Sequence, residues 1–473
     1  MYLGIDLGTT NVKAIVMDPE GKVLGTGASP VKVNYIGPDG VEQDIENIWN
    51  SLLAAIHAVG AQCDLKTVRA VGVSSQGAAI QLSDTDGTPV GPVISWMDKR
   101  GDALGQRLEF DLGTQWFMER VGHGRCCFGS KLRLIDEGLL VPGRAISYVG
   151  DMVVSRLCGR RAHDASSLSI CGIYNPALRK ADPDCLRLMH LNESTLPELV
   201  SPLEPAGALL SAIARDTGLK SGIPVSIAVH DQYAASLGAG AVMPGDTLFG
   251  GGTAWVLLVT VDALAPPVAP SAWVCNHLIP DRWGQLASLV IGGSVFELAR
   301  KVTGTLDRSL SEIEAWMDTV PSGCDGLRVS LGPGKMDCSE FGFDGADIAG
   351  LHFNHSSAHL LRAVIEGLTR SLAHNAQLFA DAGAPIARIH ATGGAARSRV
   401  TAGTIATTLQ VPVECIEGEI SARGAAMLAC ALAEGYSLLD IANHMMAPRC
   451  AIVPRSHDDP NRRQFLDELD NRA

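Results

Sequence analysis

The beginning of the chain has the pattern of three successive strands. Residues 2–6 are apolar and lead into Gly8-Thr9-Thr10, residues 12–18 are again strand-like, and a third strand starts at Val23. The segment Asp18-Pro19-Glu20-Gly21 has the composition of a tight turn. The pattern therefore predicts a three-stranded meander at the start of the protein.

Helical and strand patterns alternate through the rest of the first half. Apolar residues recur at helical spacing over 45–59, and strands are expected at 68–74, 93–96 and 224–229. Between residues 104 and 205, Gly and Pro break the chain into short segments, which is typical of an insertion on the first domain.

The opening pattern returns in outline after Met243-Pro244-Gly245-Asp246, the turn-rich segment that we take as the domain boundary. A strand at 247–249, a glycine turn at 250–253 and a strand at 255–260 repeat the order of strand, Gly/Thr turn and strand. The repetition predicts a duplicated α/β fold. The two domains are then expected at residues 1–243 and 244–473.

The C-terminal part of the sequence is mostly helical in pattern. Helices are expected at 358–382 and 398–409, with a strand at 388–391 between them. A last helix of small residues is expected to start near Ser421, which we take as its N-cap.

Composition narrows the class of protein. A chain of 473 residues is too long for a single small module, and 46% apolar residues exclude a disordered chain. The net charge of -13 disfavours binding to nucleic acid.

Targeting signals and cysteine usage point to the cytoplasm. The start of the sequence lacks a signal-peptide pattern, and its longest apolar run, 425–433, is far shorter than the roughly 20 residues of a membrane span. The 12 cysteines show no CxxC spacing, which indicates reduced thiols, and Cys126 and Cys127 have no assigned role. We therefore expect a cytoplasmic protein that binds no membrane.

A glycine turn between the first two strands carries the first candidate chemistry. In Asp6-Leu7-Gly8-Thr9-Thr10-Asn11-Val12-Lys13 the glycine lets backbone N–H groups approach phosphate oxygens, and the threonine hydroxyls add donors. Asp6, at the strand end, can hold Mg²⁺ directly or through water. An ordinary Gly-Thr turn has the same composition, so this motif alone does not decide between the two interpretations.

A carboxylate stands where a buried strand meets a helix. Asp231 suits an N-cap, and it equally suits a general base that takes a proton from an attacking hydroxyl. Phosphoryl transfer requires phosphate positioning, a metal ion and a carboxylate that orients the nucleophile. Asp6 and Asp231 can fill the last two roles.

A second glycine loop lies near the C-terminus, in Thr392-Gly393-Gly394-Ala395-Ala396-Arg397-Ser398. Such a loop either admits a base or phosphate close to the backbone or makes a tight entry into a helix. Two Gly/Thr turns and this loop in one chain indicate a nucleotide held between two domains.

These motifs resemble those of the FGGY family of carbohydrate kinases over nearly the whole chain, from Gly4-Ile5-Asp6-Leu7-Gly8-Thr9-Thr10 to Ser421-Ala422-Arg423-Gly424-Ala425-Ala426. The most specific match is Ala346-Asp347-Ile348-Ala349-Gly350-Leu351, followed after seven residues by His359-Leu360 and Ala363-Val364-Ile365-Glu366. The resemblance implies two ribonuclease H-like domains of the actin-like ATPase superfamily that flank a central cleft. The first domain would bind the sugar and hold the base, and the second would bind the nucleotide.

The resemblance also implies a role for each motif. Asp6 matches the metal-associated aspartate, and Asp231 matches the catalytic base. The positions that match the ATP-binding residues are Gly8, Thr9, Thr10, Lys13, Gly252, Thr253, Gly393, Gly394, Ala395 and Ser398. ATP and Mg²⁺ are the implied cofactors.

The candidate sugar-binding residues follow two strands of the first domain, where open α/β sheets place their ligands. They are Gln76, Trp96, Asp98 and Arg100. An aromatic face beside polar groups suits a polyol. The plainer interpretations are core packing for Trp96 and a surface ion pair between Asp98 and Arg100.

The segments 42–44, 96–100 and 396–398 look most like the xylulokinase branch, with two departures. Where xylulokinases carry a Met-His pair after Gly-Gln, this chain has Ser75-Gln76-Gly77-Ala78-Ala79, and His230-Asp231-Gln232 stands for the usual Gly-Asp-Asn. Ala78 and Ala79 make no side-chain hydrogen bonds and leave extra volume. We therefore expect D-xylulose to be a poor substrate.

The expected activity is ATP-dependent phosphorylation of a terminal hydroxyl of a small ketose or polyol. Two other classes share the scaffold: a non-kinase ATPase switch in the manner of actin or the heat-shock chaperones, and a catalytically silent sugar sensor. Asp231 after its strand, and the signature that ends at Glu366, favour the kinase. The expected partner is a small molecule, and the sequence leaves open whether the protein forms a homodimer.

Overall fold

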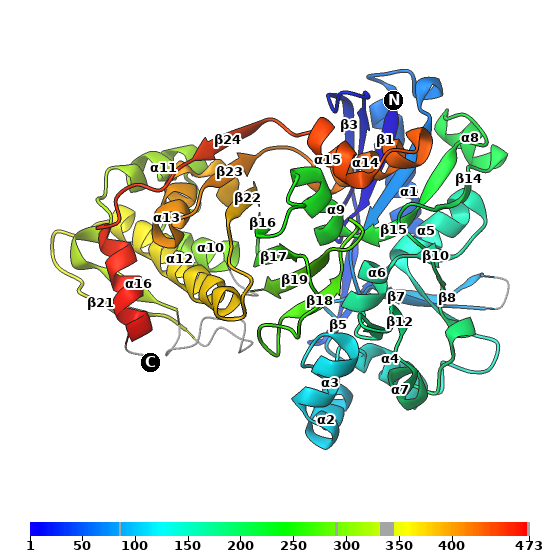
Figure 1. Ribbon diagram of the computed structural model, residues 1–473, viewed down its shortest axis with the longest axis horizontal. Coiled ribbons are helices and arrows are strands. Elements are labelled where there is room, and N and C mark those ends of the chain that lie inside the picture. Colours follow the sequence, from blue (N-terminus) through cyan, green and yellow to red (C-terminus); the bar gives the residue numbers. More distant parts are fainter. Residues whose placement is uncertain (85–86, 289–291, 332–344, 471–473) are drawn as a thin grey trace.

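The computed structural model describes residues 1–84, 87–288, 292–331 and 345–470. Within these residues the chain forms two large sheets with helices packed around them, which lie side by side in Figure 1. A smaller sheet, inserted into the first half, lies beside the first large sheet.

The first large sheet has the strand order β13-β10-β15-β6-β1-β2-β3, with β14 paired to β15. Its strands are β1 (Tyr2–Leu7), β2 (Asn11–Met17), β3 (Val23–Pro30), β6 (Ala70–Ser75), β10 (Ala162–His163), β13 (Glu198–Leu199), β14 (Pro205–Ala208) and β15 (Pro224–His230). The strands β1, β2 and β3 form the predicted antiparallel meander, whereas β6 runs parallel to both β1 and β15. The prediction of a meander is confirmed.

The second large sheet has the order β18-β19-β17-β16-β22-β23-β24. Its strands are β16 (Asp246–Gly251), β17 (Trp255–Val261), β18 (Trp273–Asn276), β19 (Trp283–Ser288), β22 (Arg388–Gly393), β23 (Val413–Ile416) and β24 (Arg449–Ile452). Here β16, β17 and β19 form an antiparallel meander, and β22 and β23 add in parallel beside β16. Both sheets therefore repeat the ribonuclease H-like order, which confirms the predicted duplicated α/β fold.

The small sheet has the order β4-β5-β8-β7-β9. Its strands are β4 (Val33–Ile36), β5 (Gly40–Gln43), β7 (Ile80–Ser83), β8 (Pro89–Ile94) and β9 (Ala145–Tyr148), and short helices follow as α2 (Asp102–Leu112), α3 (Thr114–Val121) and α4 (Gly129–Asp136). The prediction of a strand at 93–96 was wrong at its end, because β8 stops at Ile94 and Trp96 follows it in a turn.

The longer helices cover the two large sheets. They are α1 (Ile45–Gly60), α5 (Val149–Cys158), α9 (Asp231–Ala239), α10 (Gly293–Val302), α12 (Ser357–Asp381), α13 (Arg399–Leu409), α14 (Ile420–Glu434) and α16 (Pro460–Asp470). The shorter helices and strands are α6 (Ala165–Ile170), α7 (Pro183–Leu188), α8 (Ser211–Thr217), α11 (Leu310–Asp318), α15 (Leu438–His444), β11 (Tyr174–Asn175), β12 (Lys180–Ala181), β20 (Arg328–Ser330) and β21 (Asp347–Ala349). No helix among the described residues is long and apolar enough to cross a membrane.

The start of α14 differs from the prediction. The N-cap is Glu419 and the first helical residue is Ile420, so Ser421 already lies in the first turn. Glu419 makes no side-chain capping bond, because its carboxylate reaches Nζ of Lys13 on β2 at 2.6 Å. A contact between distant parts of the sequence thus takes the place of the local cap.

Helix α14 belongs to the second half of the sequence but packs on the first sheet. Figure 1 shows it, in orange, beside the blue strands β1 and β3, and the larger hydrophobic core includes its residues together with those of β1 and β6. A Cβ added to Gly72 of β6 would lie 1.7 Å from a backbone oxygen of α14, and one added to Gly4 of β1 would lie 1.9 Å from another. Gly424 of α14 approaches the backbone of α9 as closely, since its Cβ would lie 1.8 Å from an oxygen there. The helix and the sheet therefore touch backbone to backbone.

This contact predicts a large loss of stability for Gly72→Ala and for Gly424→Ala. The added methyl group forces two backbones apart, so we expect each substitution to lower the free energy of unfolding by about 3 kcal/mol. The measurement is denaturant unfolding of the purified variants. The matched control is Gly403→Ala in α13, where an added Cβ meets nothing within 4 Å and alanine is expected to stabilise by up to about 1 kcal/mol. Equal effects at the three positions would contradict the close packing.

Candidate active site

Three parallel strands end at one edge of the first sheet. Asp6 of β1 lies beside Ser74 of β6, and the last residues of β6 and β15, Ser75 and His230, are also register partners. Since the carboxyl ends of neighbouring parallel strands meet at the same edge, Asp6 and Asp231 lie close to one another there. The side chain of Gln232 reaches across to the second sheet, 3.6 Å from the position that a Cβ of Gly250 would take. This edge therefore faces the glycine turn that follows β16.

Asp231 is the first residue of α9 and is not its N-cap. The N-cap is His230, whose side chain makes no capping bond. Burial raises the pKa of Asp231 to about 6, and hydrogen bonds from the backbone and side chain of Gln232 oppose the rise. The Nε2 atom of His230 lies 3.2 Å from Oδ1 of Asp231. The carboxylate is thus held from two sides and is poised to change its protonation state near neutral pH.

Asp6 is a second perturbed carboxyl group beside the first. Burial raises the pKa of Asp6 to about 7, and the negative charge of Asp231 adds to the rise. The hydroxyl of Ser74 donates a hydrogen bond to Oδ1 of Asp6 at 2.8 Å and opposes it, as does the charge of Lys13. Lys13 pairs with Glu419, and among the described residues no Lys or Arg side chain forms an ion pair with either aspartate.

These two carboxylates fit a magnesium ion. Mg²⁺ is usually held by one or two carboxylates together with substrate phosphates and water, and not by a full cage of protein ligands. Among the described residues there is no cluster of three or more His, Cys, Asp or Glu side chains able to hold a metal. A divalent cation between Asp6 and the phosphates of a nucleotide would relieve the repulsion between Asp6 and Asp231.

The first glycine turn is joined to two of the sugar-binding candidates by a closed hydrogen-bond network. Oγ1 of Thr9 donates to Oε1 of Gln76 at 3.0 Å and accepts from Nε1 of Trp96 at 3.0 Å. Gln43 donates to the carbonyl oxygen of Thr9 at 2.8 Å and accepts from Nε2 of Gln76 at 3.0 Å. The amide of Gln76 is therefore used within the protein, whereas Trp96 is 56% exposed. Gln43 lies in the segment 42–44 that resembles the xylulokinase branch, but the sequence alone did not single it out as a residue of the site.

Asp98 and Arg100 form a buried ion pair. Oδ2 of Asp98 accepts from Nε of Arg100 at 2.9 Å and from the backbone N–H of Val41 at 2.9 Å, and Nη2 of Arg100 also donates to Glu42 at 2.6 Å. The side chain of Asp98 is 0% exposed. The geometry thus favours the ion-pair interpretation, in which these two residues support the turn that carries Trp96.

The nucleotide candidates of the second half lie side by side. Strands β16 and β22 are parallel neighbours, with Gly251 opposite Gly393. A Cβ on Gly252 would meet its nearest atom at 3.8 Å and one on Gly394 at 3.6 Å, which are ordinary van der Waals distances, so neither backbone is crowded. Ala395 packs against Gly251, where an added Cβ would lie 2.3 Å from the alanine methyl group. This pair of glycine turns has room for phosphate or ribose next to the backbone.

The other nucleotide candidates occupy distinct places. Thr253 follows Gly252 in the turn between β16 and β17, and Ser398 is the N-cap of α13, with its hydroxyl accepting from the N–H of Thr401 at 3.0 Å. Gly8 and Thr10 lie in the turn between β1 and β2, where the N–H of Gly8 donates to the carbonyl of Asn11 at 3.1 Å. The candidates therefore lie on one turn of the first sheet, between β1 and β2, and on two loops of the second, after β16 and after β22.

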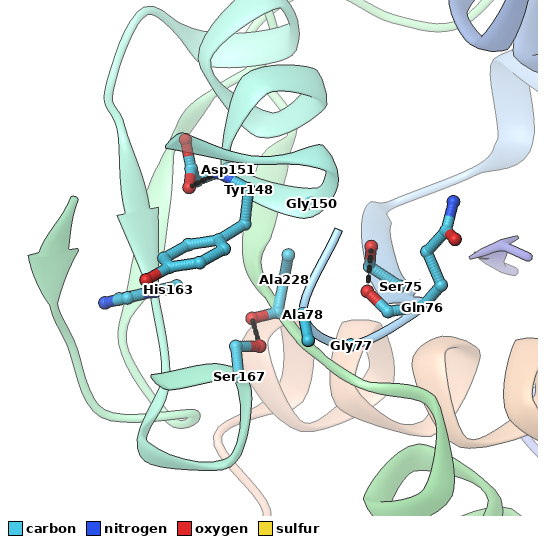
Figure 2. A pocket seen from close by; sticks show the side chains of 10 residues that line it. All are labelled: Ser75, Gln76, Gly77, Ala78, Tyr148, Gly150, Asp151, His163, Ser167 and Ala228. Atoms are coloured by element: carbon cyan, nitrogen blue, oxygen red, sulfur yellow. Dashed lines mark hydrogen bonds between the residues drawn. The ribbon is translucent and has the colours of Figure 1, made fainter. Parts of the chain in front are cut away.

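A small cavity lies behind the loop that follows β6. Figure 2 shows Tyr148, Asp151 and His163 on one side of it and Gly77 with Ala78 on the other. Its volume of about 10 Å³ suits a single water molecule. Both ring nitrogens of His163 are buried there without a hydrogen-bond partner among the described residues, and such a water would satisfy one of the two.

The same loop corrects one expectation about the sugar pocket. Ala79 is fully buried in the hydrophobic core, so it leaves no volume for a ligand. Gly77 and Ala78 line the cavity instead, and Ala78 adopts a positive φ of 57°, which is uncommon for a residue with a side chain. The two residues of this loop that line the cavity and carry no polar side chain are therefore Gly77 and Ala78.

Comparison with known families identifies the class of protein. Residues 1–238 match the N-terminal domain of the FGGY family of carbohydrate kinases, and residues 344–433 match its C-terminal domain. The chain belongs to the FGGY family. It is accordingly a carbohydrate kinase, a phosphotransferase with an alcohol group as acceptor, and members of this family use ATP as phosphate donor.

Several named kinases are similar over most of the chain. An erythritol kinase of Brucella abortus (strain 2308) is 28% identical, covering 93% of this chain and 89% of the relative. A xylulose kinase of Escherichia coli (strain K12) is 26% identical, covering 84% of this chain and 82% of the relative. The crystal structure of xylulose kinase from Rhodospirillum rubrum superposes with a TM-score of 0.88 at 23% identity, covering 99% of this chain and 98% of the other. The last likeness confirms the fold.

The raised pKa of Asp6 predicts a pH-dependent gain in stability for Asp6→Asn in metal-free protein. Between pH 4 and about 7 the folded protein keeps a proton on Asp6 that the unfolded chain has lost, so the contribution of Asp6 to stability falls as pH rises through this range. Asparagine removes that loss, so the variant should gain stability over the wild type from pH 4 to 7. Thermal unfolding without metal measures the difference, and added Mg²⁺ with ATP should stabilise the wild type more than the variant.

The control is Asp136→Asn, at the exposed end of α4, for which the difference should not change with pH. If the difference in stability between Asp6→Asn and the wild type does not change from pH 4 to 7 either, the pKa of Asp6 is not raised in the folded protein.

Proposed function

We propose that the protein transfers the γ-phosphoryl group of ATP to a terminal hydroxyl of a small ketose or polyol, with Asp231 as general base. The observation that carries the proposal is the position of Asp231. It is a partly buried carboxyl group beside Asp6, directly after β15, and its neighbour Gln232 reaches the glycine turn of the other sheet. A base at this place lies between the two sets of phosphate-binding turns.

Each residue has a part in the proposed reaction. Asp231, ionised above pH 6, accepts the proton of the acceptor hydroxyl as the hydroxyl oxygen forms a bond to the γ-phosphorus. The bond between the γ-phosphorus and the bridging oxygen breaks on the opposite side, and ADP leaves with that oxygen. Backbone N–H groups of Thr9 and Gly252 would donate hydrogen bonds to phosphate oxygens. Asp6 would hold Mg²⁺, which supplies charge neutralisation to the phosphates when bound.

The panel of acceptors follows from the relatives. Kinases named for erythritol, L-fuculose and D-xylulose are similar to this chain, so pentuloses, heptuloses, tetritols and pentitols are the compounds to test. Sugar-dependent release of ADP would establish the kinase. ATP hydrolysis that no sugar stimulates would indicate a conformational switch, and sugar binding without turnover would indicate a sensor.

Asp231→Asn should lower kcat by about 10² to 10⁴ while ATP binding and the fold persist, because the amide cannot accept the proton. The pH profile provides a second readout. Since the pKa of Asp231 is raised to about 6, kcat/KM of the wild type should rise with pH and level off above that value. The residual activity of the variant should lack this rise. Turnover near that of the wild type would remove Asp231 as the base.

The loop 76–78 predicts poor use of D-xylulose. Gly77 and Ala78 offer no side-chain donor where xylulokinases carry methionine and histidine, and a pocket without such a group loses its discrimination for the matching hydroxyl. We expect another ketose or polyol, with a different chain length or configuration, to have the higher kcat/KM. The measurement is kcat/KM for each member of the panel. If D-xylulose is best by a wide margin, other residues supply the contact and the argument from the loop is wrong.

A further inference from the structure

The ring of His230 occupies the space that a side chain at position 77 would need. A Cβ on Gly77 would lie 2.7 Å from Cδ2 and 2.8 Å from Nε2 of His230, and 2.6 Å from a methyl carbon of Ile170. All three separations are shorter than carbon atoms tolerate. The two departures from the xylulokinase pattern, at residue 77 and at residue 230, therefore meet in one contact. Gly77, in the loop after β6, makes room for the ring of His230 at the end of β15.

This packing keeps the imidazole ring beside the base. The side chain of His230 is only 7% exposed, and its Nε2 lies 3.2 Å from Oδ1 of Asp231. The backbone before Asp231 is held as well, because the N–H of His230 donates to the hydroxyl of Ser166 at 3.0 Å. That hydroxyl in turn donates to the carboxylate of Asp164 at 2.7 Å. The ring has little freedom to turn away from Asp231.

The hydrogen-bonding options of the ring select one tautomer. Burial lowers the pKa of His230 to about 4, so near neutral pH the ring is uncharged and carries one N–H. The Nδ1 atom has no hydrogen-bond partner among the described residues. A proton on Nδ1 would be a buried donor without an acceptor, and it would leave the lone pair of Nε2 against a carboxylate. A proton on Nε2 avoids both costs, and Oδ1 of Asp231 lies 3.2 Å from that nitrogen.

We propose that His230 is a positioning residue, which donates Nε2–H to Oδ1 of Asp231 and so directs the acceptor hydroxyl to Oδ2. The proposal rests on the proposed function, because His230 acts only through the base. The hydrogen bond stabilises the ionised carboxylate, and it fixes which oxygen takes the proton. Gly77 is the residue that permits this arrangement.

A pair of variants separates the two ring nitrogens. In His230→Gln the side-chain amide can place an N–H near the position of Nε2, whereas in His230→Asn the amide reaches only as far as Nδ1. We expect the asparagine variant to lose about 10- to 100-fold in kcat, with KM for ATP and for the acceptor changed by less than about threefold. The glutamine variant should recover most of that loss. Equal kcat values in the two folded variants would overturn the proposal, since a packing role would not distinguish them.

A second measurement does not depend on turnover or on any substitution of His230. Long-range ¹H–¹⁵N correlation spectra of wild-type protein labelled with ¹⁵N-histidine report which nitrogen of His230 carries the proton, with Asp231→Asn used to assign the signal. A neutral ring protonated at Nε2 supports the proposal, and one protonated at Nδ1 overturns it. If the wild type phosphorylates no member of the acceptor panel, the proposed function fails, while the tautomer still decides whether the hydrogen bond exists.

Discussion

The backbone contact between α14 and the first sheet is the constraint on which the rest of the structure depends. A helix can approach a sheet this closely only where the sheet lacks a side chain, and Gly4 and Gly72 supply those places, while Gly424 allows the same close approach to α9. The contact brings the C-terminal half of the chain back onto β1, β6 and α9, the elements that carry Asp6, the loop 76–78 and Asp231. The position of Asp231 is thus set by a helix nearly two hundred residues further along the chain.

The ion pair between Lys13 and Glu419 follows from the same contact. Lys13 lies opposite Asp6 on the neighbouring strand, and in another arrangement it would be the natural partner of that carboxylate. Because α14 offers Glu419 to Lys13 at 2.6 Å, Asp6 and Asp231 are left to repel each other in a buried setting. Two carboxyl groups whose pKa values lie near neutrality are costly for stability and suited to holding a metal ion and moving a proton.

Several residues recognised from their sequence motifs form hydrogen bonds or ion pairs with other residues of the protein. The amide of Gln76 is bonded to Thr9 and Gln43, and the carboxylate of Asp98 is enclosed by Arg100 and a backbone N–H. Glu366 of the family signature is also bonded within the protein, because it is buried and accepts hydrogen bonds from Arg362 and from the N–H of Gly323. A motif marks the residues that a fold requires, and these include residues that hold others in place.

The sequence by itself determined the elements whose signals are local. Apolar spacing and turn residues predicted the meander, its repetition after residue 246 and the helices near 45–59, 358–382 and 398–409, because such patterns depend only on neighbours in the chain. Only the tertiary structure decided that Glu419 and not Ser421 precedes α14, that Ala79 belongs to the core, and that the ring of His230 fills the space at Gly77. Each of these depends on atoms brought together from distant parts of the chain. Burial, close backbone approach and the pairing of charges exist only after the chain has folded, so no local pattern records them.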